Sequence, residues 1–387
     1  MKIINSRRIN EKFASFFEIH SASTTLNTML THYVSSTSVI PSDIDSLRKE
    51  AESVKETEKI PFSVERIMLL LILKDMVEQI LAGYPDDIYA FFMDKLVEES
   101  KVFDLEEINL NPYIRDIDFR DKSLGDFELR YMSSMPFEFQ IYDVPRRVDE
   151  LFVRIPRICC FADKYEYPAI FQKSIKSTWM SVSPNEIYTV QEHIDMAKGK
   201  VLTLGCGMGY FAYMAALKDE VTSITIIERE ESVIELFETA IFPQFKTKDK
   251  IKVIKADAID FMASLEDGEY DYCFADIWIG VNDMAPYFAI KEIGRKLKKT
   301  KISYWIEQAF AMVLEGYVYM EIMNAFLEAN GKKSPESEYP FSEEEVRGRN
   351  YIQRLLKDEV ISKPEHIDYY MNPDNIIKMI DKADIVF

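Results

Sequence analysis

Hydrophobic and polar positions follow different patterns in successive parts of the chain, and each pattern predicts a different kind of structure. Residues 1–110 carry apolar residues at helical spacing, most clearly over Val64–Leu81, and predict a helical N-terminal domain. Residues 111–185 hold short aromatic and β-branched runs separated by prolines, which is typical of strands and turns and predicts a β-rich segment. Residues 308–387 return to helical spacing and predict a helical C-terminal region.

Residues 186–307 alternate short apolar runs with segments of helical periodicity. The runs are KVLTLG, TSITIIE, IKVIKAD, YDYCFAD and ISYWIE, and a helical segment lies between each pair. Near-continuously apolar strands that alternate with helices are typical of a mostly parallel sheet covered on both faces. We therefore expect an α/β fold class, with this sheet domain at 186–307 between the β-rich segment and the helical C-terminal region.

The first apolar run ends in three glycines spaced two residues apart, within VLTLGCGMGY. Ligands of such sheets bind at the carboxyl ends of the strands, where glycine permits a positive φ and a close approach of backbone to ligand. The pattern is G-x-G-x-G, formed by Gly205, Gly207 and Gly209. Dinucleotide-binding folds use G-x-G-x-x-G, and Tyr210 stands where their third glycine belongs. A nicotinamide-dependent oxidoreductase is therefore a weak alternative.

Acidic residues close the next three apolar runs. Glu228 ends the second run about 20 residues past the glycines, where a carboxylate can accept both hydroxyls of a ribose. Asp257 ends the third run, where it can accept from an adenine amino group while the Ala258 amide reaches the ring. Asp276 ends the fourth. Helix starts and N-caps also attract acids, but the combination with the glycines predicts a nucleoside-binding site.

Residues 200–307 resemble the class I S-adenosylmethionine-dependent methyltransferases, which have a Rossmann-like sheet. VLTLGCGMGY looks like their first motif, ITIIERE like their ribose-binding acid, VIKADA like their adenine segment and YDYCFADIW like their fourth motif. The resemblance implies S-adenosyl-L-methionine as the cofactor, with Asp276 beside its sulfonium and amino groups. The cofactor-binding residues that it implies are Gly205, Cys206, Gly207, Gly209, Glu228, Arg229, Asp257, Ala258 and Asp276.

The same segment is also similar to the spermidine synthase branch of this fold, whose members use decarboxylated S-adenosylmethionine. The phrases VTSITIIEREESVIELFE and IKVIKADAIDFM carry that similarity, as does a β-rich segment before the sheet domain. Those enzymes have a further acid soon after the fourth strand, which Ile277–Gly280 does not supply. The chain also lacks the Asn/Asp-Pro-Pro-aromatic motif of amino-methylating nucleic-acid enzymes, and a helical region follows Glu307 where an antiparallel hairpin is usual.

Methyl transfer from a sulfonium requires alignment of nucleophile and methyl group, and a base only when the nucleophile is protonated. Asp276 is the candidate catalytic residue, as a proton acceptor or as an orienter of a substrate amine. The segment STWMSVSPNEIYTVQEH leads into the sheet domain and can cross its ligand face. Candidate substrate residues, for which plain packing is the alternative role, are Trp179, Ser183, Glu186, Tyr188, Gln191 and Trp278.

The charge and composition of the chain limit the classes of ligand and partner that it is expected to bind. The net charge of −19 repels phosphate backbones, so we expect a small-molecule substrate and no nucleic acid. The four cysteines show no C-x-x-C spacing, and the four histidines suggest no metal cluster, so no metal site is expected.

The start of the chain lacks a secretory h-region, and the longest apolar run, Ile67–Leu73, is too short to span a bilayer. A cytoplasmic protein without membrane contact is expected, and its oligomeric state stays open.

These observations favour a soluble S-adenosylmethionine-dependent methyltransferase that acts on a small molecule. One alternative is an aminopropyl- or aminocarboxypropyl-transferase of the spermidine synthase type, which shares the site and differs in the carbon that is attacked. Another is a protein that binds the cofactor without catalysis and acts through its helical ends.

Overall fold

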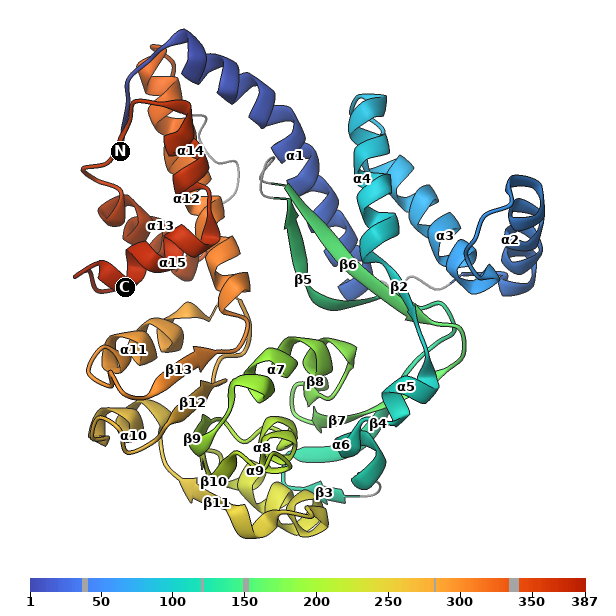
Figure 1. Ribbon diagram of the computed structural model, residues 1–387, viewed down its shortest axis with the longest axis vertical. Coiled ribbons are helices and arrows are strands. Elements are labelled where there is room, and N and C mark those ends of the chain that lie inside the picture. Colours follow the sequence, from blue (N-terminus) through green and yellow to red (C-terminus); the bar gives the residue numbers. More distant parts are fainter. Residues whose placement is uncertain (37–40, 120–121, 149–152, 282, 334–340) are drawn as a thin grey trace.

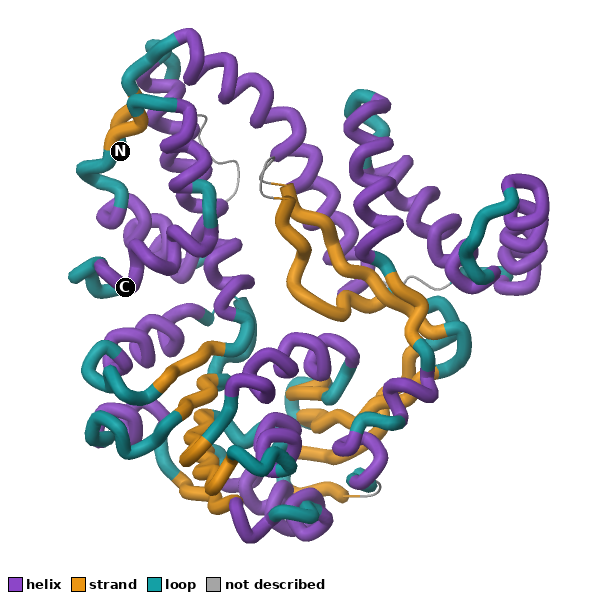
Figure 2. Tube along the Cα trace, in the orientation of Figure 1, coloured by secondary structure: helices purple, strands orange, loops and turns teal. Residues whose placement is uncertain are grey.

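The computed structural model describes residues 1–36, 41–119, 122–148, 153–281, 283–333 and 341–387. Figure 1 shows a helical N-terminal part, a curved β-rich part, a sheet domain with helices around it, and a helical C-terminal part. Figure 2 shows that strands gather in the middle of the chain and that helices dominate toward both ends. The protein is therefore mixed α/β, as its hydrophobic pattern indicates.

The N-terminal part consists of α1 (Arg7–Ser36), α2 (Ile44–Glu58), α3 (Val64–Ile80) and α4 (Asp86–Glu99). Helices α1, α3 and α4 pack through a shared apolar cluster against a strand of the β-rich part. Two short strands lie in the range that was expected to be helical. Strand β1 (Lys2–Ile3) pairs with β14 (Val360–Ile361), and β2 (Lys101–Phe103) pairs with β6 (Val153–Phe161).

The β-rich part follows the short helices α5 (Leu105–Asn109) and α6 (Pro112–Asp116) and forms two sheets, one of which also includes β2 from before α5. One sheet has the order β2-β6-β5. The other is antiparallel, with the order β3-β4-β7-β8. The remaining strands are β3 (Lys122–Leu124), β4 (Phe127–Ser134), β5 (Gln140–Val148), β7 (Tyr165–Gln172) and β8 (Ser177–Ser181).

The sheet domain contains five parallel strands in the order β11-β10-β9-β12-β13. Their bounds are β9 (Gly199–Leu204), β10 (Val221–Glu228), β11 (Ile251–Lys255), β12 (Tyr272–Ala275) and β13 (Lys301–Tyr304). The surrounding helices are α7 (Pro184–Met196), α8 (Tyr210–Ala216), α9 (Glu231–Leu236), α10 (Ala258–Ser264) and α11 (Met284–Gly294). Helix α9 continues into a π-helical turn, η1 (Phe237–Ile241), and the 3-10 turns η2 (Phe242–Gln244) and η3 (Lys248–Lys250) precede β11.

Alternate side chains of the central strand enter different cores. Val201 packs in the cluster that includes residues of α7 and α8, whereas Leu202 and Leu204 pack in the cluster that includes residues of α10 and α11. Successive residues of a strand point to opposite faces, so both faces of this sheet are buried. The arrangement is compatible with the Rossmann-like sheet expected from the sequence.

The C-terminal part consists of α12 (Glu307–Ala329), α13 (Glu343–Leu355), α14 (Pro364–Tyr370) and α15 (Pro373–Lys382). Helix α12 follows β13 directly and packs against α13 and α15. Among the described helices it alone is long and apolar enough to cross a membrane, a test that core helices of soluble proteins also pass. Glu315 on α12 is 3% exposed and pairs with Arg154 on β6, so a buried ion pair joins the C-terminal part to the β-rich part.

Candidate functional site

The strand order creates a topological switch point between β9 and β12. From β9 the chain proceeds to β10 and β11 on one side, and then crosses to β12 and β13 on the other. The loop after β9 carries the three glycines, and Asp276 follows β12 directly. Open parallel sheets bind ligands at this position, outside the carboxyl ends of the strands.

All three glycines of the loop have a positive φ, at +94° for Gly205, +54° for Gly207 and +74° for Gly209. A Cβ at Gly205 would lie 2.1 Å from the carbonyl oxygen of Asp276, and a Cβ at Gly209 would lie 2.5 Å from the Phe237 ring. These two glycines are therefore required by the packing of the protein itself. A Cβ at Gly207 would meet only the Met180 side chain, at 3.4 Å, which leaves Gly207 as the glycine best suited to a ligand.

Glu228 connects the end of β10 to the glycine loop. Its Oε2 accepts a hydrogen bond from the backbone N–H of Cys206 at 3.1 Å. Its Oε1 accepts from the backbone N–H groups of Arg229 and Glu230, at 2.8 and 2.9 Å. A carboxylate oxygen can accept more than one hydrogen bond, so these contacts leave capacity for two hydroxyl groups of a ligand. The Arg229 side chain itself is exposed.

Asp257 is the N-cap of α10, which is the structural alternative to the adenine-binding role expected from the sequence. Its Oδ1 accepts from the backbone N–H groups of Ile259 and Asp260, at 2.9 and 3.1 Å. Its Oδ2 has no hydrogen-bond donor among the described residues and can accept from a ligand. Ala258, the first residue of α10, is buried. The capping role and the adenine-binding role are therefore compatible in one side chain.

Asp276 and Glu186 are the most strongly perturbed acids of the site. Burial, and secondly the negative charge of Glu228, raises the pKa of Asp276 to about 7, although its side chain keeps some contact with solvent. Burial, and secondly the charge of Asp276, raises the pKa of Glu186 well above its usual value. Neither side chain has a hydrogen-bond or cationic partner in the described part of the chain. Acids whose pKa values are strongly perturbed by burial and by like charges are typical of functional sites.

The acids of this site can be compared with the charges that S-adenosylmethionine carries. Its sulfonium and amino groups are positively charged, and a cation near Asp276 would offset the repulsion among Glu186, Glu228 and Asp276. Gly207 offers backbone without a Cβ, and Glu228 and Asp257 retain acceptor capacity. These residues fit the charge and the hydrogen-bond donors of that cofactor.

The two candidate tryptophans lie in different surroundings. Trp278 is 5% exposed and makes edge contacts with the rings of Tyr287 and Phe310, which favours a packing role. Trp179 is 43% exposed and its ring makes an edge contact with Phe127, so one part of it is available to a ligand.

The other candidates of the segment before β9 lie in α7 or at its start. Tyr188 stacks on Phe103 with ring centroids 5.1 Å apart. Gln191 is exposed and donates to Asp195 at 2.8 Å, one turn along the same helix. Ser183 occupies the N-cap position of α7 without a side-chain capping bond. Of the candidates in this segment, Glu186 is the one that the structure connects electrostatically to Asp276.

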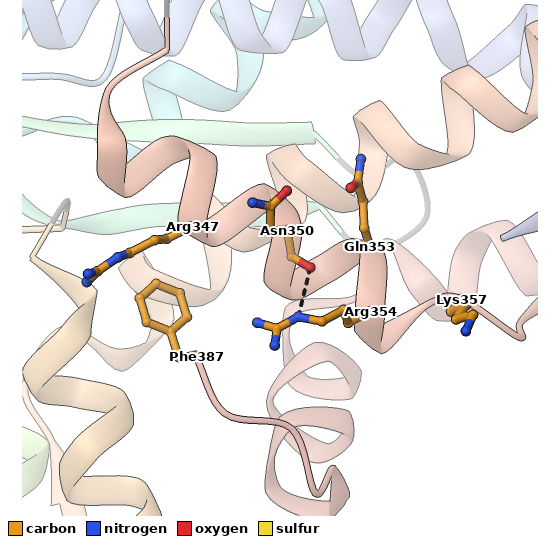
Figure 3. A pocket seen from close by; sticks show the side chains of 6 residues that line it. All are labelled: Arg347, Asn350, Gln353, Arg354, Lys357 and Phe387. Carbon is orange, nitrogen blue, oxygen red and sulfur yellow. Dashed lines mark hydrogen bonds between the residues drawn. The ribbon is translucent and has the colours of Figure 1, made fainter.

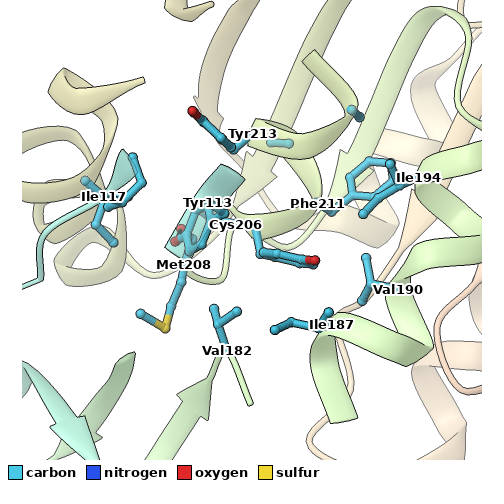
Figure 4. Close-up of a cluster of buried hydrophobic side chains, with 14 of the residues drawn as sticks. Tyr113, Ile117, Val182, Ile187, Val190, Ile194, Cys206, Met208, Phe211 and Tyr213 are labelled. Atoms are coloured by element: carbon cyan, nitrogen blue, oxygen red, sulfur yellow. Dashed lines mark hydrogen bonds between the residues drawn. The ribbon is translucent and has the colours of Figure 1, made fainter. Parts of the chain in front are cut away.

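Two residues at the start of α6, which no sequence pattern pointed to, contact the glycine loop and the first residue of α8. The Tyr113 hydroxyl donates to the backbone carbonyl of Met208 inside the loop, and Asn111 donates to the Tyr210 hydroxyl at 3.0 Å. Figure 4 shows Tyr113 beside Cys206 and Met208 in the buried cluster under the loop. No local pattern could have revealed these contacts, because about a hundred residues separate the partners in sequence.

Within the described ranges, no group of three or more His, Cys, Asp or Glu side chains could hold a metal ion. All four cysteines are buried thiols outside any disulfide. Burial raises the pKa of Cys206 well above the ordinary value, which favours the neutral thiol in the glycine loop.

Comparisons with known proteins give partial similarity to solved structures. No protein-family model matches the chain. No curated protein matches it. The chain is similar to spermidine synthase from Thermotoga maritima, at 12% identity and a TM-score of 0.27, over 38% of this chain and 57% of that one. It is also similar to a conserved hypothetical protein of Streptococcus pyogenes, at 17% identity and a TM-score of 0.24, over 28% of this chain and 66% of that one. A third similar structure is monomeric WbdD, at 18% identity and a TM-score of 0.23, over 31% of this chain and 28% of that one. This chain thus spans less than two thirds of the length of each of these proteins, and the likeness is confined to part of the fold.

Proposed function

We propose that this protein is a transferase that binds S-adenosylmethionine at the switch point of its parallel sheet and transfers the methyl group to a small acceptor. One observation carries the proposal. The glycine loop, Glu228, Asp257 and Asp276 stand at the carboxyl ends of four strands of one sheet, beside the switch point between β9 and β12. Capping and tight turns explain each feature separately, but a nucleoside-binding site explains their combination.

In this site Glu228 would accept from the ribose hydroxyls, Asp257 from the adenine amino group, and Gly207 would lie against the ligand. The bound cofactor would supply an electrophilic methyl group to a lone pair of the acceptor, with S-adenosylhomocysteine as the leaving group that takes the electron pair of the carbon–sulfur bond. An acceptor amine must lose a proton in the process. Asp276, with a pKa of about 7, can accept that proton near neutral pH.

An aminopropyl or aminocarboxypropyl transfer is the second candidate function. The sequence argued against it because Ile277–Gly280 contains no acid. The negative charge of Asp276 contributes to the raised pKa of Glu186, so α7 would supply a second acid to this site. Two acids beside the reacting centre suit an acceptor that binds as a polyamine cation.

Thermal unfolding with and without ligands tests the proposal. S-adenosylmethionine or S-adenosylhomocysteine at about 100 times its dissociation constant should stabilise the protein by about 2.7 kcal/mol. A matched titration with NAD serves as the control for adventitious nucleoside binding. Stabilisation by NAD without a response to either S-adenosyl ligand would contradict the proposed cofactor. Mass spectrometry of the acceptor then distinguishes a methyl gain from a larger alkyl gain.

A further inference from the structure

A cationic groove lies on the C-terminal part of the protein and shares no residue with the glycine loop. The groove has a volume of about 620 Å³ and is open to solvent, because the side chains that line it from α13 are exposed. It lies along α13 and the turn after it, and the Phe387 ring lies beside Arg347 (Figure 3). The residues that line it are Arg347, Asn350, Gln353, Arg354, Lys357 and Phe387.

The three cations of this groove form a row. Arg347 and Arg354 are seven residues apart on α13, so helical geometry places them on one face about 10 Å apart, and Lys357 follows in the turn after the helix. In the described part of the chain, neither Arg347 nor Lys357 has an acidic side-chain partner. A row of unpaired cations is unexpected in a chain of net charge −19, in which acids outnumber bases.

Two polar contacts orient the middle of the row. The Arg354 guanidinium donates to the backbone carbonyl of Asn350 at 3.3 Å and to that of Val386 at 2.9 Å. Gln353 donates to Glu321 of α12 at 2.8 Å, which holds the rim of the groove. Arg354 thus uses two of its N–H groups on backbone carbonyls and keeps others for a ligand.

Helix electrostatics do not explain the whole row. Cations stabilise the C-terminal end of a helix, which accounts for Arg354 and Lys357. Arg347 is the fifth residue of α13, beyond the acidic first turn formed by Glu343, Glu344 and Glu345, so neither helix terminus accounts for its charge. Its side chain is exposed and is available to a ligand in the groove.

We propose that the α13 groove binds a small molecule with a di- or triphosphate chain. Guanidinium groups recognise phosphate oxygens through paired hydrogen bonds, and a single phosphate is too short to engage both ends of the row. Acids flank the row on both sides, with Glu343–Glu345 before it and Asp358 and Glu359 after it. These acids would repel any anion that extends past the groove, so a long nucleic-acid strand is disfavoured.

Calorimetric titration of the full chain tests this proposal with four probes. The probes are inorganic triphosphate, ATP, inorganic phosphate and a single-stranded oligonucleotide of about 20 nucleotides. We expect triphosphate and ATP to bind at least about tenfold more tightly than inorganic phosphate, because more charge-assisted hydrogen bonds form. Equal affinity for triphosphate and ATP would assign recognition to the phosphate chain, and tighter binding of ATP would assign part of it to the nucleoside.

Substitutions separate the groove from general surface charge. Arg347→Gln and Arg354→Gln should each weaken triphosphate binding about tenfold or more. Arg349→Gln is the matched control, because Arg349 lies on the same helix but its guanidinium sits 4.2 Å from the Phe341 ring and does not line the groove. Affinity for S-adenosylhomocysteine should stay unchanged in all three variants, so the outcome is independent of the proposed function.

Three results would overturn the proposal. One is the absence of measurable binding of triphosphate and ATP at millimolar concentration. Another is equal triphosphate affinity in Arg347→Gln, Arg354→Gln and the parent protein. The third is tighter binding of the oligonucleotide than of ATP, which would assign the groove to nucleic acid.

Discussion

The Glu228 carboxylate accepts a hydrogen bond from the backbone N–H of Cys206 and thereby joins the end of β10 to the glycine loop after β9. The same carboxylate is the proposed acceptor for the ribose hydroxyls. In that proposal one side chain both holds the loop in place and presents charge to the ligand. Substitution of Glu228 should affect ligand binding through both effects.

Glu228→Ala is expected to weaken binding of S-adenosylhomocysteine about tenfold or more, because charge-assisted hydrogen bonds to ribose are lost. The chain should still fold, since Glu228 lies at the end of a strand and outside the apolar cores. Isothermal titration gives the affinity and circular dichroism checks the fold. If the variant binds as tightly as the parent protein, Glu228 serves only to hold the loop and the helix start.

Gly207→Val is expected to abolish ligand binding in a protein that remains folded. The added methyl groups would occupy the space against which the ligand lies, and the positive φ of +54° adds backbone strain. Gly331→Val is the matched control, because Gly331 has a φ of +70° and nothing within 4 Å of its added Cβ. Equal affinity in Gly207→Val and in the control would mean that the ligand does not approach the loop.

The raised pKa of Asp276 predicts a pH dependence of stability. Between its usual pKa near 4 and its folded pKa of about 7, the folded protein holds a proton that the unfolded chain has released. This contribution to stability is present at low pH and is lost as the pH rises through about 7. Asp276→Asn should therefore lose less stability than the parent protein between pH 5 and pH 8. Urea unfolding at both pH values measures the difference, and identical losses would argue against the raised pKa.

Incubation with decarboxylated S-adenosylmethionine and either putrescine or spermidine should leave the masses of the polyamines unchanged. The proposed reaction is methyl transfer, and Ile277–Gly280 lacks the acid that the resemblance to spermidine synthases would place after the fourth strand, which leaves only Glu186 as a candidate second acid. Mass spectrometry against a no-enzyme control checks this expectation. A gain of one aminopropyl group would instead favour the second candidate function, and its loss in Glu186→Gln would identify Glu186 as the second acid.

Arg154→Met is expected to destabilise the protein by about 3 to 5 kcal/mol, because it leaves Glu315 buried without its cation. The double variant Arg154→Met with Glu315→Leu removes both charges and should recover much of that loss. Urea unfolding of the single and double variants gives the coupling between the two positions. A single variant as stable as the parent protein would show that the ion pair does not stabilise the contact between β6 and α12.

Local patterns in the sequence were sufficient to predict the α/β class and the run of strands from β9 to β13. Hydrophobic periodicity is set by neighbours within one element, so apolar strands and amphipathic helices are visible without a structure. The glycine loop and the acids at 228, 257 and 276 were found in the same way, because each directly follows an apolar run. Their roles in ligand binding remain predictions.

Contacts between distant segments were decided only by the tertiary structure. Three such relationships join residues far apart in the chain: the electrostatic effect of Asp276 on Glu186, the hydrogen bonds of Asn111 and Tyr113 to Tyr210 and Met208, and the pairing of β1 with β14. The sequence also could not assign Gly205 and Gly209 to packing, since their neighbours Asp276 and Phe237 come from other elements. Such contacts depend on how whole elements pack, and local periodicity carries no information about which element becomes the neighbour.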